Sequence, residues 1–186
     1  MTQLGKLIVM AGPSAVGKGT LAKFIVDNYQ GFHLSVSATT RPARSGEVDG
    51  VSYLFVSDAE FTEMVAAGQM LEWATVHGKH SYGTPREGVD KALEQGLNVL
   101  LEIDVQGAFQ VKEAFPGSVL VFVKPPSFEE LRNRLDKRGT ESEKEKQIRL
   151  ETAEVELAQA EFFDFVVIND EVARCAQEVV DLSQST

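Results

Sequence analysis

The stretch from Leu7 to Leu21 reads LIVMAGPSAVGKGTL. A short apolar run leads into a glycine-containing turn, and a lysine then opens a helical pattern. Gly12, Gly17 and Lys18 follow the spacing G-x-x-x-x-G-K, in which glycines let backbone N–H groups curl around an anion and the helix start presents its positive dipole end. The stretch therefore predicts a strand, a phosphate-binding loop and a helix, with Lys18 beside the β- and γ-phosphates of a bound nucleoside triphosphate.

The loop is predicted to contact the triphosphate along its whole length. The expected contacts are Gly12, Pro13, Ser14, Ala15, Val16, Gly17, Lys18, Gly19 and Thr20. Gly19 departs from the general pattern, which has Ser or Thr for magnesium there, so the hydroxyl moves one place to Thr20. Ala15 stands where such loops often carry glycine, and a positive φ at this residue would strain the loop slightly.

Length and charge limit the architecture and the partners. The chain has 186 residues and a formal net charge of −10. This length fits one domain, or one core domain with small insertions. Because nucleic-acid backbones and anionic membranes attract a local excess of Lys and Arg, the acidic balance argues against both as partners. A few basic residues gathered in one cleft would still suit a small phosphorylated ligand.

Cysteine usage and the N-terminus indicate a cellular compartment. Cys175 is the only cysteine, so an intrachain disulfide and a cysteine metal site are excluded, and we expect an inert residue on a C-terminal helix. No charged segment followed by a long apolar one opens the chain, and no apolar run approaches the roughly 18 residues of a membrane helix. We expect a soluble, cytoplasmic protein.

Four short apolar runs alternate with helical patterns along the chain. They are Leu7–Ala11, Asn98–Asp104, Ser118–Val123 and Phe165–Ile168. The third run is apolar at every position from Val119 to Val123, as expected of a strand covered on both faces. The sequence therefore predicts an α/β fold, a P-loop three-layer arrangement with a mostly parallel sheet wrapped by helices.

Two segments interrupt this alternation. Residues 35–85 combine short alternating stretches with a helical stretch at Asp58–Ala67, which indicates a small, mainly β insertion. Residues 132–149 read RNRLDKRGTESEKEKQIR, which indicates two helix ends joined by a mobile, exposed turn. We expect a core made of residues 1–34 and 86–186, within which residues 132–149 form a helical lid.

A second set of motifs follows the phosphate-binding loop. It consists of Ser35-Val-Ser-Ala-Thr-Thr-Arg-Pro-Ala-Arg44, Gly46-Glu-Val-Asp-Gly50, Tyr53, Leu71-Glu-Trp-Ala74 and Tyr82-Gly-Thr-Pro85. Together with the loop, these motifs closely resemble those of the guanylate kinases, in the family's order and with near-family spacing as far as Asn169-Asp170. The resemblance implies an enzyme that transfers the γ-phosphate of ATP to GMP with Mg²⁺, giving ADP and GDP.

Arg41 and Arg44 lie in a proline-containing turn and precede Tyr53 and Tyr82. Guanidinium forks and phenolic hydroxyls can bind a phosphate together. On the residues alone, a solvated basic turn is the alternative. The resemblance implies that these arginines and tyrosines hold the GMP phosphate, with Gly83 in the same site.

Glu72 is the candidate base-reading residue. A carboxylate presents two acceptors, and guanine presents two adjacent donors, N1–H and the exocyclic N2 amine, whereas adenine offers no such pair. A buried carboxylate would be left unpaired by the wrong base, so such a site rejects it. By resemblance, Ser37 and Thr84 complete recognition around the O6 side of guanine. Taken alone, Glu72 beside Trp73 fits an exposed strand residue equally well.

Acidic residues end the second apolar run at Glu102 and Asp104. The resemblance implies that Asp104 contributes to the nucleotide site, and we expect it to contact GMP. Together with Thr20 it is also our candidate for the magnesium site, partly through water. Glu102 lies two residues earlier on the strand and points to the same face, so it is positioned to assist.

The charged segment supplies candidate catalytic arginines. Arg134 and Arg138 are four residues apart, on one face of a continuous helix, and Arg149 follows the turn. A charge-rich helix pair with surface ion pairs is the alternative. The resemblance makes these lid arginines that act with Lys18 on transition-state charge, and it places Asn169 near the adenine base of ATP.

One stretch departs from the family pattern. Gly-Asn-Tyr-Tyr-Gly is expected before Thr-Pro-Arg, and this chain has Gly78-Lys-His-Ser-Tyr-Gly83. Tyr82 and Gly83 keep their places, so we expect the substrate contacts to survive on a changed hairpin. His77 and His80 are too isolated for a metal site, and we expect them at the surface.

Three other functions compete with the kinase hypothesis. The first is a GTPase switch, because Asp104-Val-Gln-Gly107 fits its D-x-x-G motif and residues 133–136 loosely resemble its N-K-x-D motif. The second stretch lacks the lysine, however, and falls in a predicted helix. A guanylate-kinase-like binding module that lacks catalysis is the second, and another nucleoside monophosphate kinase is the third. The retained Lys18 disfavours the module, and Glu72 disfavours another base. The partners expected are ATP and GMP, with no nucleic acid, no membrane and no obligatory protein.

Overall fold

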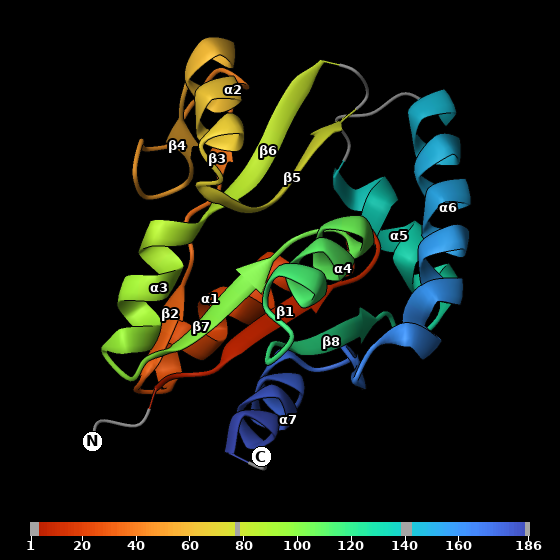
Figure 1. Cartoon of the computed structure of the whole chain (residues 1–186). Helices are drawn as coiled ribbons and strands as arrows, with labels where there is room; N and C mark the ends of the chain where they lie inside the picture. Colours follow the sequence, from red (N-terminus) through yellow and green to blue (C-terminus); the bar gives the residue numbers. More distant parts are fainter. Residues whose placement is uncertain (1–3, 77–78, 139–142, 185–186) are drawn as a thin grey trace.

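The computed structural model describes residues 4–76, 79–138 and 143–184, and these residues form two β-sheets (Figure 1). The larger sheet has five strands in the order β2-β7-β1-β8-β9, and every pairing in it is parallel. Its strands are β1 Leu7–Ala11, β2 Phe32–Leu34, β7 Asn98–Glu102, β8 Val119–Lys124 and β9 Phe165–Ile168. The predicted parallel α/β sheet is therefore confirmed, and β2 is an edge strand that the apolar pattern did not indicate.

Helices cover both faces of the larger sheet. Leu7 and Val9 of β1 belong to a buried cluster on one face, to which two helices contribute, and Ile8 and Met10 belong to the opposite cluster, in which two others supply most of the helical residues. The first pair of helices is α3 Arg86–Glu94 and α4 Val105–Ala114; the second pair is α1 Lys18–Asn28 and α7 Val172–Gln184. All five residues of β1 are buried because alternate side chains enter different layers.

A smaller sheet rises above the core in Figure 1. It has four strands in the order β4-β3-β6-β5, of which β5 and β6 form an antiparallel hairpin. Its elements are β3 Ala38–Thr39, β4 Leu54–Phe55, β5 Met70–Val76, β6 His80–Pro85 and helix α2 Asp58–Ala66. Ser57 begins α2 with a capping box to Glu60, and Phe61 and Met70 fill the space between helix and sheet.

The charged segment forms two helices that stand beside the core (Figure 1). Helix α5 spans Phe128–Arg138, and helix α6 spans Glu143–Ala158 and continues into the short 3-10 helix Gln159–Phe162. The turn expected between the helices lies outside the described residues. None of the helices in the described ranges combines the length and the apolar composition of a membrane span.

The predicted strand from Asn98 to Asp104 is two residues too long. β7 ends at Glu102, because Asp104 caps helix α4 and its Oδ1 accepts a hydrogen bond from the Gly107 N–H at 2.7 Å. The cap turns the chain sharply at the edge of the sheet, so Asp104 keeps its place beside the carboxyl ends of the strands. Cys175 lies on α7, the expected C-terminal helix, and is fully buried.

Among the described residues, Phe122 is the largest fully buried side chain, and it packs edge-on against Phe163 with ring centroids 5.0 Å apart. We expect Phe122→Ala to lower the free energy of unfolding by about 3–5 kcal/mol, because the substitution leaves a cavity between sheet and helices. Urea denaturation measures the loss. Phe165→Ala, at a ring that is 39% exposed, is the control and should cost less than half as much; equal losses would contradict the packing argument.

Candidate active site

The phosphate-binding loop joins β1 to α1 and depends on glycine at two positions. Gly12 has φ 145°, and a Cβ there would lie 2.3 Å from the Val123 carbonyl oxygen. Gly17 has φ 97° and precedes the first turn of α1. Ala15 adopts φ 65°, so the expected positive φ is present at a non-glycine residue, at a cost in backbone strain.

Lys18 is the first residue of α1 and folds back over the loop. Its Nζ donates to the carbonyl oxygens of Gly12 at 2.6 Å and Pro13 at 3.3 Å. The ammonium group therefore lies inside the backbone loop that would surround bound phosphates. The placement of Lys18 beside the β- and γ-phosphates themselves stays a prediction.

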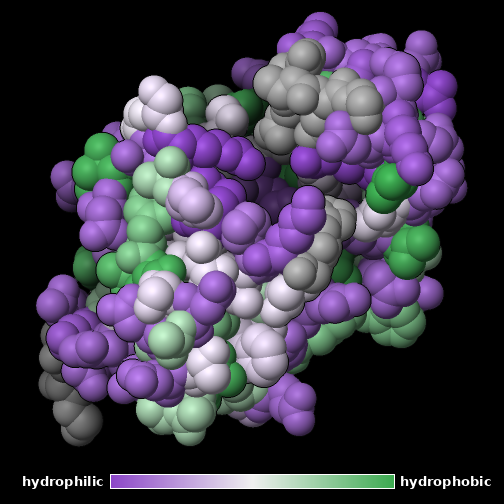
Figure 2. Space-filling view, turned by 90° about the horizontal axis from the view of Figure 1, so that it is seen from above, coloured by the Kyte–Doolittle hydropathy of each residue, from purple (hydrophilic) through white to green (hydrophobic). Residues whose placement is uncertain are grey.

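A cleft of about 570 Å³ runs from the loop to the smaller sheet. Figure 2, which looks down on the molecule from above, shows hydrophilic residues around a hollow between two lobes. Residues of the predicted ATP and GMP sites line this one cleft: Gly12, Ser14, Lys18, Ser37, Tyr53, Glu72, Tyr82, Gly83 and Asp104. The fold thus brings together candidates that are up to 92 positions apart in sequence.

Glu72 lies on β5 at the wall of this cleft and is only 6% exposed. The Thr84 hydroxyl, fully buried on the neighbouring strand β6, donates to Glu72 Oε1 at 2.7 Å. Burial raises the pKa of Glu72 to about 7, and the nearby charge of Asp104 adds to the shift. Glu72 is therefore not the exposed strand residue of the alternative hypothesis.

Arg41 is held by a residue for which the sequence analysis gave no role. Its Nη1 and Nη2 donate to the two carboxylate oxygens of Glu47 at 3.0 and 2.9 Å, and the Arg44 N–H donates to Glu47 Oε2 at 2.7 Å. The guanidinium carbon lies 5.4 Å from the centre of the Tyr53 ring, which meets the Tyr82 ring edge-on. The six-residue spacing of Arg41 and Glu47 was visible in the sequence, but their pairing depends on the turn between them.

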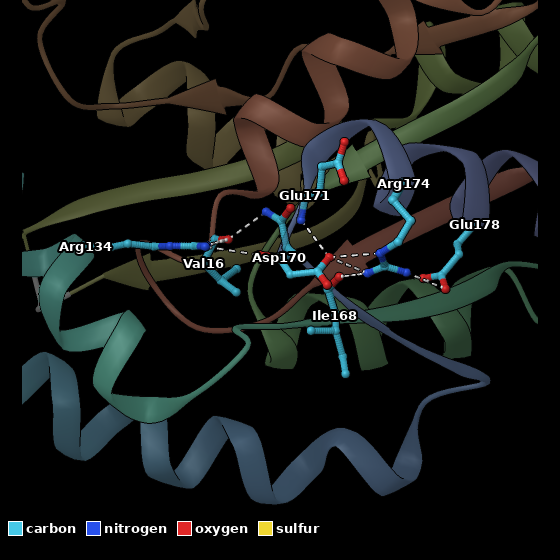
Figure 3. Close-up of polar contacts among 8 residues, drawn as sticks. Val16, Arg134, Ile168, Asp170, Glu171, Arg174 and Glu178 are labelled. Atoms are coloured by element: carbon cyan, nitrogen blue, oxygen red, sulfur yellow. Dashed lines mark hydrogen bonds and ion pairs between the residues drawn. The ribbon is translucent and has the colours of Figure 1, made fainter.

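Two of the three arginines predicted for the lid contact the phosphate-binding loop directly. Arg149 Nη1 of α6 donates to Ser14 Oγ at 2.7 Å. Arg134 Nη1 of α5 and Asn169 Nδ2 both donate to the Val16 carbonyl oxygen, at 3.0 and 2.9 Å, as Figure 3 shows for Arg134 and Val16. The side chain of Arg138, the third lid candidate, lies outside the described residues. In this structure Arg134 thus supports the tip of the loop.

An ion network steadies the turn that carries Asn169. Arg174 on α7 donates through Nε and Nη2 to Asp170 Oδ1, through Nη1 to Glu178 and through Nη2 to the Ile168 carbonyl oxygen (Figure 3). Hydrogen bonds from Arg174 and the Glu171 N–H lower the pKa of Asp170. The sequence analysis did not include this network. Arg174 and Glu178 lie one turn apart on α7, and Asp170 lies two residues before the helix begins, so the four-residue spacing was the available signal.

Carboxylate side chains lie beside the phosphate-binding loop, where a bound cation would balance the negative charge of the phosphates. A Cβ at Gly19 would lie 3.0 Å from Glu102 Oε2, so the glycine in place of Ser or Thr leaves room for this carboxylate. Glu102 and Asp104 line the main cleft, and Thr20 and Glu102 line a smaller hollow around the loop. Among the described residues, no three His, Cys, Asp or Glu side chains group closely enough to hold a metal alone. The oxygen-only donors suit a Mg²⁺ ion shared with phosphates and water.

Comparison with known proteins identifies the family. The family model described as guanylate kinase matches residues 4–185. The chain belongs to the guanylate kinase family. A guanylate kinase of Leifsonia xyli is 58% identical over 176 residues, covering 95% of this chain and 69% of that protein, and one of Nocardia farcinica is 48% identical over 186 residues, covering 100% and 96%.

A solved guanylate kinase structure shares the fold. The crystal structure of guanylate kinase from Anaplasma phagocytophilum superposes with a TM-score of 0.79 at 32% identity, covering 99% of this chain and 87% of that one. Membership of the family confirms a nucleotide-binding nucleoside monophosphate kinase. The echo of a GTPase motif at Asn133 and Asp136 lies within helix α5, as expected.

The raised pKa of Glu72 predicts a pH-dependent stability. Between the ordinary value of 4.5 and the folded value of about 7, the folded state binds more protons than the unfolded chain, so the contribution of Glu72 to stability falls as pH rises through this window. We expect Glu72→Gln to unfold with a free energy about 1–3 kcal/mol higher than wild type at pH 8. At pH 4.5 the two should converge in chemical denaturation, and an advantage of equal size at both pH values would contradict the assignment.

Proposed function

We propose that this member of the guanylate kinase family transfers the γ-phosphoryl group of ATP to GMP, giving ADP and GDP. One observation carries the proposal: a single cleft is lined at one end by Lys18 of the phosphate-binding loop and at the other by the buried Glu72. ATP bound at the loop and GMP bound beside Glu72 would therefore lie in the same cleft. The names of the two relatives described above support the same activity.

Base selection follows from the buried carboxylate of Glu72. Guanine N1–H and N2–H would donate to its two oxygens, whereas adenine would leave it unpaired. The Thr84 hydroxyl holds the carboxylate from β6, and Ser37 also lines the cleft. The Thr84 contact uses one lone pair of Oε1, so both carboxylate oxygens keep acceptor capacity for the base.

The GMP phosphate would lie near Arg41, Arg44, Tyr53 and Tyr82. Glu47 presents to Arg41 the planar, bidentate pairing that a phosphate also offers, so the guanidinium is oriented before substrate arrives. Tyr53 and Tyr82 line the cleft, and the Arg44 side chain is exposed. This arrangement supports assigning the four residues to the acceptor phosphate, with Gly83 next to Tyr82 on β6.

The triphosphate of ATP would lie on the backbone N–H groups of the loop and the start of α1, with Lys18 and Arg149 on its phosphates. Phosphoryl transfer needs little covalent chemistry from the protein, so positioning and charge stabilisation carry it. Arg134 and Asn169 support the loop at Val16, and we assign Arg138 to the same lid. Residues 35–85 and the lid, residues 132–149, would close over both substrates and exclude water.

The oxygen donors beside the loop fit a magnesium ion that accompanies ATP. Thr20 and Asp104 would hold it, partly through water, and Glu102 is placed to help because Gly19 leaves it room. Bound Mg²⁺ neutralises negative charge on the β- and γ-phosphates. The protein's own contribution is to keep these side chains at the carboxyl ends of β1 and β7.

The first test is ADP formation from Mg-ATP with GMP, AMP, CMP and UMP offered separately. We expect turnover with GMP alone, and Lys18→Ala should lower kcat/KM by at least about a hundredfold because it removes a charge that stabilises the transition state. Glu72→Gln should lose the preference for GMP, since an amide cannot accept from both guanine donors.

The other outcomes separate the competing functions. Turnover with AMP in place of GMP would show that Glu72 does not read the base. Folded protein without turnover of any nucleoside monophosphate would favour a binding module over an enzyme. Activity that survives Lys18→Ala unchanged would contradict the assigned phosphate site.

A further inference from the structure

Helix α4 of the core meets the edge of the smaller sheet at Trp73. The Trp73 N–H donates to Gln110 Oε1 at 3.1 Å, and Gln110 Nε2 donates back to the Trp73 carbonyl oxygen at 3.2 Å. Because β5 is the last strand in the order β4-β3-β6-β5, these backbone groups lie on the open edge of the sheet. The side-chain amide supplies one acceptor and one donor, as a neighbouring strand would.

Gly107 lies one turn before Gln110 on the same face of α4. A Cβ at Gly107 would lie 2.9 Å from Glu72 Oε2 and 3.3 Å from Asp104 Oδ1. The carboxylate of Glu72 therefore packs against the bare Cα of a buried helical glycine, while its other oxygen accepts from Thr84. Glycine is disfavoured inside a helix, so its presence here requires a local reason, and the space for Glu72 is one.

We propose that Gly107 and Gln110 are positioning residues that set the specificity for guanine by fixing the carboxylate of Glu72 from helix α4. Gln110 holds the strand at the residue next to Glu72, and Gly107 leaves the space in which the carboxylate turns toward the cleft. The inference rests on the proposed function, in which Glu72 reads guanine. It places part of the base selection on a core helix, outside the smaller sheet that carries Glu72.

Substitution of Gly107 should separate function from folding. The atom that an added methyl group meets first is the end of a flexible side chain, so Glu72 can move away without displacing backbone. Alanine is also the better helix former. The Gly107→Ala protein should therefore fold normally with the carboxylate displaced from its acceptor position.

The test is steady-state kinetics of the wild type, Gly107→Ala, Gln110→Ala and Gln110→Glu. For Gly107→Ala we expect the KM for GMP to rise about tenfold or more, the effect of weakening a hydrogen bond to a charged group, while the KM for ATP stays within about twofold. The ratio of kcat/KM for GMP to that for IMP, which lacks the 2-amino group, should fall. Gln110→Ala should act in the same direction, and Gln110→Glu at least as strongly, because it sets an oxygen against the Trp73 carbonyl.

Two matched controls test whether the effects depend on the positions of Gly107 and Gln110 or only on the kind of substitution made there. Gly88→Ala alters a helical glycine of α3 whose Cβ would meet nothing within 4 Å. Gln177→Ala removes two hydrogen bonds, to Tyr29 and Asp181, on α7. Both controls should keep wild-type KM values and the wild-type preference for GMP over IMP.

The outcomes distinguish this inference from the proposed function. A wild type that does not phosphorylate GMP would overturn the proposed function and, with it, the inference. An active wild type whose Gly107 and Gln110 variants keep the KM for GMP, or raise the KM for ATP by the same factor, would overturn the inference alone. Thermal melting verifies folding, and if Gly107→Ala does not fold, Gln110→Glu decides the question by the same two measurements.

Discussion

The site depends on the parallel pairing of β1 with β7 on one side and β8 on the other. Parallel strands bring their carboxyl ends to one edge of the sheet. At that edge, the phosphate-binding loop follows β1, Glu102 ends β7 and Asp104 lies just beyond it, and Asn169 follows β9. Residues that are far apart in the sequence are therefore neighbours in the fold, because the three strands end at the same edge of the sheet.

The loop is rigidly supported from several elements at once. Gly12 approaches the Val123 carbonyl so closely that no side chain fits between them. The Val16 carbonyl accepts from Arg134 and Asn169, and Ser14 accepts from Arg149. A loop fixed in this way offers its N–H groups to phosphate without paying further conformational entropy, which is the usual advantage of preorganisation.

The buried carboxylate of Glu72 serves base recognition but lowers the stability of the folded protein. Burial raises its pKa to about 7, so the ionised carboxylate is unfavourable in the folded protein above that pH. The fold retains it between a buried hydroxyl on β6 and a glycine on α4. A carboxylate of this kind destabilises the protein without ligand and gains its partners when a base with two adjacent donors is bound, which is how specificity arises from an unpaired polar group.

The sequence by itself determined the strand-loop-helix unit, the parallel sheet and the family motifs, because these depend on local spacing and periodicity that short stretches carry on their own. Only the tertiary structure decided the partners of the site residues: Arg134 on the Val16 carbonyl, and Gln110 on the backbone of Trp73, 37 positions away. Such contacts depend on which elements the fold places side by side, and no local periodicity records a distance across the molecule.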